Sequence, residues 1–191
     1  MQEMIYIRQI IDFQPSCEQE ERDQALILDL CLSSGDVLTR KNRAYHLTSS
    51  GLILNEARDR MLMVHHNIYR TWTWTGGHAD GDCDLVAIAL KEAEEETGAK
   101  HFSLLSNRMA SLDIIPVYGH IKKGQYVSAH LHLNAAYLLE VSDKDPLSVR
   151  PDENSAVSWT PLAEVAAQSK EPELIRIFQK MLAREDIILP V

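Results

Sequence analysis

Residues 76–99 of this chain, GGHADGDCDLVAIALKEAEEETGA, constrain its fold and chemistry more than any other stretch. Leu85, Ala89, Glu92 and Glu96 recur at helical spacing, so they predict one stripe of a helix that follows the glycine pair. The stripe is apolar at its start and acidic at its end. Charged side chains on a helix normally face solvent, whereas these two glutamates continue a face that is predicted to be buried.

The acidic end of this stripe is predicted to hold a metal ion. Glu95 lies three residues after Glu92 and directly before Glu96, so like charges crowd one region of the helix and repel each other. A hard divalent cation relieves this repulsion and removes the cost of burying an unpaired carboxylate. Gly76 and Gly77 precede the helix, and residues without a Cβ let the main chain approach a ligand closely.

The same stretch resembles the Nudix box, the signature of the Nudix hydrolases. That pattern is a Gly, five residues, a Glu, seven residues, Arg-Glu, an apolar residue, any residue, Glu-Glu, any residue, a Gly and a final apolar residue. Read over residues 77–99, the positions that match are Gly77, Glu92, Ala93, Glu95, Glu96, Gly98 and Ala99. The length of the pattern and its several fixed residues make it a specific signal.

Two positions depart from the box. Cys83 stands where the first Glu is expected, and we interpret it as a small buried residue flanked by acids, among them Asp84 as a candidate helix N-cap. Lys91 stands where Arg is expected. It keeps the positive charge and reaches Glu95 at i, i+4, but it lacks the bidentate fork of Arg. Lys91 is therefore retained among the predicted catalytic residues.

The resemblance covers about residues 43–168 and implies the Nudix fold. That fold is an α+β arrangement, an α/β/α sandwich with a mixed β-sheet, in which the box forms a loop–helix–loop. The order of strands, helix, strands and helices along the chain agrees with it. We predict a largely helical N-terminal extension over residues 1–42, packed on a Nudix domain over residues 43–191 that includes a C-terminal helix.

Individual elements are predicted from periodicity and turn residues. Pro15 and Ser16 begin a helix that runs to about Leu32. The alternating segment TWTWT predicts a strand. The segments SLDIIPVYGHI and YVSAHLHLNAAYLLEV predict two strands joined by the turn-rich tetrapeptide KKGQ.

The resemblance implies the reaction and the metal. Nudix hydrolases cleave a diphosphate linkage in a nucleoside diphosphate derivative, so the implied cofactor is Mg²⁺ or Mn²⁺. Carried over by position, Glu92 and Glu96 are metal ligands, and Glu95 is a third ligand or orients the others. The carbonyl of Gly76 is a main-chain ligand. Glu153, in a later polar loop, is the candidate general base.

Four further side chains are candidates for substrate binding. Arg70 precedes the TWTWT strand and can meet a phosphate, and His78 follows the glycine pair. His130 and His132 alternate on one face of a predicted strand, so they are expected to line a pocket together. A zinc site would require a third ligand, and the spacing identifies none.

Composition restricts the partners and the compartment. The net charge of −9 argues against binding to nucleic acid or to an anionic membrane surface. The three cysteines form no C-x-x-C pair, so a reducing compartment fits. The N-terminus lacks the pattern of a signal peptide, and no stretch reaches the ~20 apolar residues of a membrane span. We expect a cytoplasmic protein with a small-molecule partner, and a homodimer is left open.

Two other functions are weighed against hydrolysis. A non-catalytic Nudix-fold sensor of a nucleotide or ADP-ribose tends to lose the box glutamates, which this chain keeps. An enzyme like the isopentenyl diphosphate isomerases shares the fold, but its catalytic cysteine would fall at Gly76. The substrate itself is not determined. ADP-ribose, dinucleoside polyphosphates, nucleotide sugars, oxidised nucleoside triphosphates and coenzyme A derivatives remain candidates.

Overall fold

The computed structural model describes residues 5–33, 36–122 and 124–190. Parts of the predicted extension (residues 1–4 and 34–35), one residue of the KKGQ turn (123) and the last residue of the predicted domain (191) lie outside the described residues. The helices are α1 (Ile5–Asp12), α2 (Glu18–Ser33), α3 (Leu85–Thr97), α4 (Leu162–Gln168) and α5 (Pro172–Ala183). The strands are β1 (Tyr45–Leu54), β2 (Arg60–His66), β3 (Thr71–Thr73), β4 (Thr75–His78), β5 (Ser103–Leu104), β6 (Ser111–Val117), β7 (His120–Lys122), β8 (Gln125–Val127), β9 (His130–Glu140) and β10 (Asn154–Pro161).

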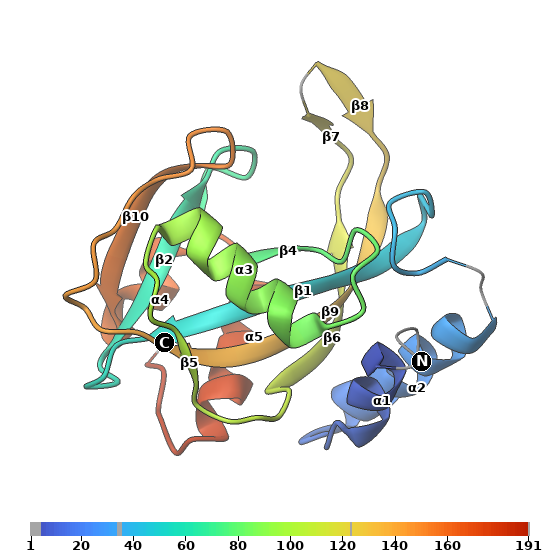
Figure 1. The fold of residues 1–191 in the computed structure, drawn as a ribbon, viewed down its shortest axis with the longest axis horizontal. Coiled ribbons are helices and arrows are strands. Elements are labelled where there is room, and N and C mark those ends of the chain that lie inside the picture. The colour runs from blue at the N-terminus through green and yellow to red at the C-terminus, as the bar shows by residue number, and fades with distance from the viewer. Residues whose placement is uncertain (1–4, 34–35, 123, 191) are drawn as a thin grey trace.

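The main sheet is mixed, and its centre is a long parallel pair. Strands β1 and β9 run side by side in register from Tyr45 opposite Leu131 to Leu54 opposite Glu140. The order across the sheet is β10-β2-β1-β9-β5, with β3 beside β2, β4 beside β1 and β6 beside β9 (Figure 1). Each of these pairs other than β1–β9 is antiparallel. Strands β7 and β8 form a separate hairpin that projects from one end of the molecule.

Alternate residues of the central strands face two different apolar cores. In β1, Leu47 and Ile53 belong to the core shared with α1, α2 and α3, whereas Leu52 and Leu54 belong to the core shared with α4 and α5. This alternation is the period-2 geometry of a strand that is buried on both faces. The sheet therefore lies between helical layers, and the predicted α+β sandwich is confirmed.

The N-terminal segment is helical and is tied to the rest of the chain by a buried acid. Helix α2 packs against β6, and α1 contacts α2 (Figure 1). The Glu20 carboxylate accepts hydrogen bonds from the Ser16 N–H at 2.7 Å and from Arg184 of the segment after α5 at 2.9 Å. It also lies 3.2 Å from the Nζ of Lys180. The helix predicted from Pro15–Ser16 to about Leu32 corresponds to α2.

Three predicted strands are divided in the structure. The TWTWT segment forms β3, which pairs with β2, and β4, which pairs with β1, because the chain changes neighbours at Trp74. The segments on either side of KKGQ each divide as well, giving β6 and β7 before the turn and β8 and β9 after it. In each case the residues are extended as predicted, but hydrogen-bonding partners set the ends of the strands.

Within residues 5–33, 36–122 and 124–190, none of the helices has the length and apolar character that a membrane crossing requires.

Candidate active site

Helix α3 carries the carboxylates predicted to bind the metal, and local interactions define both of its ends. Asp84 accepts hydrogen bonds at Oδ1 from the N–H groups of Val86 and Ala87, each at 3.2 Å, and so acts as the N-cap. Gly98 follows the last turn with a φ of 77°, a left-handed conformation that glycine adopts without strain. The helix thus ends directly after its acidic turn.

Three carboxylates converge at this end of α3. Glu92 and Glu96 lie one turn apart on the helix, and Glu153 comes from the loop that precedes β10. One carboxylate oxygen of each lies within 4.8 Å of the others. Oxygen ligands on opposite sides of Mg²⁺ are about 4.2 Å apart, since each bond is about 2.1 Å. The cluster therefore has nearly the dimensions of a divalent-cation site.

Burial and mutual repulsion act on these carboxylates. Glu96 is 5% exposed, and burial, together with Glu92 and Glu153, raises its pKa to about 8. Burial also raises the pKa of Glu92. Both shifts show that the charged forms are disfavoured in the protein without an ion, and a divalent cation between the carboxylates would reverse this effect.

The glycine pair is in contact with the same carboxylates. The N–H of Gly76 lies 3.3 Å from Oε2 of Glu96 and donates to it. A Cβ on Gly77 would lie 2.4 Å from the carboxyl group of Glu92, so a larger residue there would displace that carboxylate. The structure places the Gly76 N–H, rather than its carbonyl, against Glu96, and the carbonyl as a metal ligand remains a prediction.

Glu95 is bound by a cation that sequence reasoning missed. Its carboxylate accepts a hydrogen bond from Nη1 of Arg150 at 2.6 Å, and the same nitrogen lies 3.2 Å from Glu153 and 3.7 Å from Glu92. Lys91 is exposed and lies 3.8 Å from Glu95, as its i, i+4 spacing predicts. Arg150 lies three residues before Glu153 in the sequence. A basic residue this close to the candidate base could have indicated a cationic partner for the acidic cluster.

A cavity of about 530 Å³ opens beside Glu96 and the glycine pair. Polar residues of the parallel strands β1 and β9 form one wall of this cavity. Thr48 and Ser50 of β1 each donate to the Oδ1 of Asn134 in β9 at 2.9 Å. The Asn134 Nδ2 is buried and has no hydrogen-bond partner within the described part of the chain. This amide is therefore available to a bound molecule.

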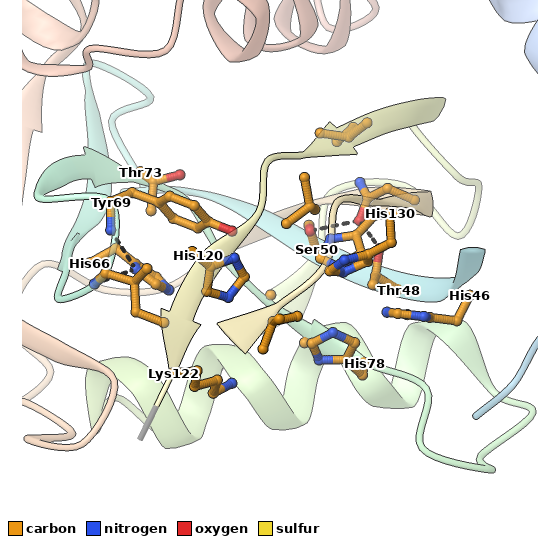
Figure 2. Close-up of a pocket in the computed structure, with 18 of the residues that line it drawn as sticks. His46, Thr48, Ser50, His66, Tyr69, Thr73, His78, His120, Lys122 and His130 are labelled. Carbon is orange, nitrogen blue, oxygen red and sulfur yellow. Dashed lines mark hydrogen bonds between the residues drawn. The ribbon is translucent and has the colours of Figure 1, made fainter. Parts of the chain in front are cut away.

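The predicted histidines line this cavity and are joined by another. The ring centroid of His46 lies 5.0 Å from those of His78 and His130 and 5.2 Å from that of His132. Figure 2 shows His46, His78 and His130 at one side of the cavity, with His66 and His120 at the other. Burial, with the neighbouring imidazoles, lowers the pKa of His78 to about 3 and that of His132 to about 2.

His46 had a detectable signal in the sequence. His46, Thr48 and Ser50 alternate with apolar or small residues, as His130, His132 and Asn134 do on the later strand. Two strands with the same polar alternation are candidates to share a face. The pairing of His46 with His132 required the tertiary structure.

Arg70 does not lie among the cavity-lining residues. It is exposed, with a φ of 52°, at the turn between β2 and β3. Other cationic side chains occupy the lining instead, namely Arg40, Arg43 and Lys122. Sequence reasoning missed these three because nothing in their local pattern distinguishes them from surface charges.

The family model that describes the NUDIX domain matches residues 44–181. The chain belongs to the NUDIX family. A search of curated protein sequences finds no significant match. The predicted recognition and the predicted enzyme class are confirmed, so the chain is a NUDIX hydrolase, an enzyme class that acts on pyrophosphate bonds.

Solved structures share the NUDIX fold at low sequence identity. A Caenorhabditis elegans Ap4A hydrolase in a binary complex is 16% identical, with a TM-score of 0.55 over 73% of this chain and 97% of that chain. The MutT protein from Methanosarcina mazei is 19% identical, with a TM-score of 0.56 over 76% and 97%. The Escherichia coli dihydroneopterin triphosphate pyrophosphohydrolase is 14% identical, with a TM-score of 0.54 over 72% and 95%. These likenesses show the fold.

Cys83 marks where this NUDIX box departs from its pattern. The side chain is partly buried and packs against the core beneath α3. The Asp84 cap and the Gly98 terminus of the box helix form around this departure. The geometry of the box helix therefore does not require a glutamate at position 83.

Proposed function

We propose that this NUDIX hydrolase cleaves a diphosphate linkage in a nucleoside diphosphate derivative, and that it requires Mg²⁺ or Mn²⁺. The observation that carries the proposal is the convergence of Glu92, Glu96 and Glu153 within 4.8 Å beside an open cavity. Ionised carboxylates beside the cavity repel the phosphate groups of a substrate unless a cation neutralises them.

The carboxylates fit a hard divalent cation by donor type and by spacing. All three offer oxygen, the donor that Mg²⁺ prefers. In this proposal Glu92 and Glu96 are ligands, together with the carbonyl of Gly76, and Glu95 orients them from its ion pair with Arg150. A bound ion would supply positive charge opposite the diphosphate and would make a bound water more acidic.

Glu153 is proposed as the general base that accepts a proton from the attacking water. Its loop is held against α3 by the next residue, because Asn154 donates through Nδ2 to the carbonyl of Glu96 at 2.9 Å. Asn154 also accepts from the N–H of Arg150 at 3.2 Å. These contacts hold Glu153 beside the ligands, which is the placement a base requires.

The cavity lining favours an anionic substrate with an aromatic group. Arg40, Arg43 and Lys122 supply positive charge, and Tyr69 and Tyr126 supply aromatic surface. His78, His130 and His132 line the same cavity and are proposed to contact the substrate, whereas the exposed position of Arg70 gives its proposed role no support. Ap4A and dihydroneopterin triphosphate are named for two fold relatives, so both belong in the substrate panel.

The experiment is a hydrolysis assay over a panel of nucleoside diphosphate derivatives, with products identified by mass spectrometry. Each substrate is incubated with Mg²⁺, with Mn²⁺ and with EDTA. Glu96→Gln is compared with Glu94→Gln, a matched control on the same helix whose carboxylate pairs with Lys100. We expect cleavage that EDTA abolishes, that Glu96→Gln strongly reduces and that Glu94→Gln preserves. Binding without turnover by the folded, metal-loaded protein would instead favour the sensor.

We propose that residues 1–42 are an extension, in keeping with a family match that begins at residue 44. The net charge of −9 supports a small-molecule partner rather than nucleic acid or a membrane. The three cysteines without a C-x-x-C pair support the proposed cytoplasmic location. A homodimer stays an open prediction.

A further inference from the structure

A second group of metal-ligating side chains lies in the cavity, and its donors are nitrogen rather than oxygen. We propose that His46, His130 and His132 bind a transition-metal ion of the Zn²⁺ class at a site separate from the carboxylate cluster. One ring nitrogen of each histidine lies within 4.8 Å of the others. This inference depends on the geometry of the histidines and not on the proposed hydrolytic function.

The sheet brings the three rings together from distant parts of the chain. In the parallel pair of β1 and β9, His46 is directly opposite His132. His130 lies two residues before His132, so it faces the same side of β9. All three line the cavity, and Figure 2 shows His46 and His130 side by side there.

Hydrogen bonds from the main chain define which nitrogen is free in two of the rings. The Nδ1 of His46 lies 3.2 Å from the carbonyl oxygen of Asn42, and the Nδ1 of His130 lies 2.9 Å from that of Ser128. A carbonyl only accepts, so each Nδ1 carries the proton and donates. The lone pair is therefore on Nε2 in both rings. Metal-binding histidines typically have this arrangement, with the other ring nitrogen donating to a carbonyl.

One distance already agrees with coordination. The Nε2 atoms of His130 and His132 are 3.3 Å apart. Two nitrogens bound to a tetrahedral zinc ion at 2.0–2.1 Å lie about 3.3 Å from each other. The separation of these two nitrogens therefore fits one ion, and His46 supplies the third ligand nitrogen within 4.8 Å of them.

An independent observation comes from His46 itself. Its side chain is buried, with 4% exposure, and its Nε2 has no hydrogen-bond partner in the part of the chain that the structure describes. Leaving a buried acceptor without a partner costs about 1–3 kcal/mol. A hydrogen bond from His132 to His130 would satisfy that pair but would leave His46 unpartnered. A metal ion satisfies all three.

The residues around the three histidines suit an ion that has one coordination position open to the cavity. His78 forms a further wall, with its ring centroid 5.0 Å from those of His46 and His132. Arg40, Arg43 and Lys122 are cations of the cavity lining, and the charge of Arg40 is offset by Asp80, to which its Nε and Nη2 donate at 2.8 and 2.7 Å. Three protein ligands and a fourth position facing a cavity are the arrangement of zinc sites that bind a water or a substrate group. Mg²⁺ does not compete, because it prefers oxygen donors.

The test is a Zn²⁺ titration of the full, untagged chain after metal removal, by calorimetry and by metal analysis of the dialysed protein. The wild type is compared with His46→Gln, His130→Gln, Glu96→Gln and a control, His101→Gln, whose side chain is 83% exposed on the surface. X-ray absorption at the zinc edge then identifies the ligands. Circular dichroism verifies that each variant is folded.

We expect one Zn²⁺ to bind in the presence of excess Mg²⁺, with imidazole ligands at about 2.0 Å. His46→Gln and His130→Gln should weaken binding at least tenfold, whereas His101→Gln and Glu96→Gln should leave it unchanged. If His46→Gln does not fold, the partly exposed His130 decides the result. Binding that is absent in the wild type, unchanged in His130→Gln or lost in Glu96→Gln would overturn the proposal. The last outcome would assign the ion to the carboxylates, and none of these outcomes bears on diphosphate hydrolysis with Mg²⁺.

Discussion

Glu20 and Glu96 are both buried carboxylates, but their surroundings are opposite. Glu20, fully buried on α2, has cationic partners in Arg184 at 2.9 Å and Lys180 at 3.2 Å. Burial by itself raises its pKa, but the Ser16 N–H and these two cations outweigh burial and lower it. Glu96 faces other carboxylates, and its pKa rises to about 8.

The sign of the neighbouring charges distinguishes a carboxylate that stabilises the fold from one that belongs to a functional site. A carboxylate that has its own cations links two parts of the fold, here α2 and the end of α5. A carboxylate buried among like charges lowers stability, and such a group is commonly found where a ligand completes the site. Burial alone therefore does not reveal function, whereas the sign of the neighbouring charges does.

The largest expected effect lies on the functional side of this comparison. Glu96→Gln should lower kcat by about 10²- to 10³-fold, the range found when one stabilising group at a reacting centre is removed. Glu20→Gln should change kcat by less than about threefold at a temperature where both variants are folded, because Glu20 does not line the cavity. Steady-state kinetics with saturating Mg²⁺ measure both. Equal losses of kcat in the two variants would show that Glu96 and Glu20 do not differ in function.

The next effect lies on the structural side. Glu20→Ala should lower the free energy of unfolding by about 3 kcal/mol, because it leaves Arg184 without its buried carboxylate partner, whereas Lys180 keeps Asp113. Urea unfolding at pH 7, followed by circular dichroism, measures the change. Glu18→Ala is the matched control, since Glu18 is exposed on the same helix and pairs only loosely with Arg22. A loss below about 0.5 kcal/mol would show that Glu20 does not stabilise the fold.

Glu96→Gln should have the reverse effect on stability. The folded-state pKa of Glu96 lies above its ordinary value of 4.5, so the folded chain binds this proton more tightly than the unfolded chain does. The contribution of this proton binding to the free energy of unfolding is fully present below about pH 4.5 and is lost as the pH rises toward 8. In EDTA at pH 7.5, Glu96→Gln should raise the free energy of unfolding by about 1–3 kcal/mol. Urea unfolding at pH 7.5 and pH 4.5 tests this, and a destabilised variant at pH 7.5 would contradict it.

The smallest effect is the pH dependence at Glu20. Its folded-state pKa lies below 4.5, so its contribution is present above that pH and is lost as the pH falls through the lowered value. The stability difference between the wild type and Glu20→Gln should be about 1 kcal/mol at pH 7 and should shrink in acid. Urea titrations at pH 7, 5 and 3 follow the difference, and a gap that widens in acid would reverse the assigned sign.

Local patterns predicted most of the fold and the acidic half of the site. The stripe that ends in Glu92 and Glu96 specifies its own helix, since Asp84 and Gly98 cap it within the same stretch of chain. Strand positions followed from alternation, but strand ends did not. TWTWT divides at Trp74 because its two halves pair with different neighbours, which no local pattern records.

Side chains that meet across the fold could not be found in this way. Arg150 pairs with Glu95 from 55 residues away, and Glu20 meets Arg184 from 164 residues away. Arg70 is exposed at a turn and lies outside the cavity lining, so its phosphate contact stays a prediction.

The sequence by itself determined the family, the box helix and the acids at its end, because periodicity and capping act over a few neighbouring residues. Only the tertiary structure decided which charges meet. It placed Glu153 beside Glu92 and Glu96, and it placed His46 beside His130 and His132 through the register of a parallel strand pair. Electrostatic interactions and metal coordination depend on distances in space, and those distances are set when the sheet forms.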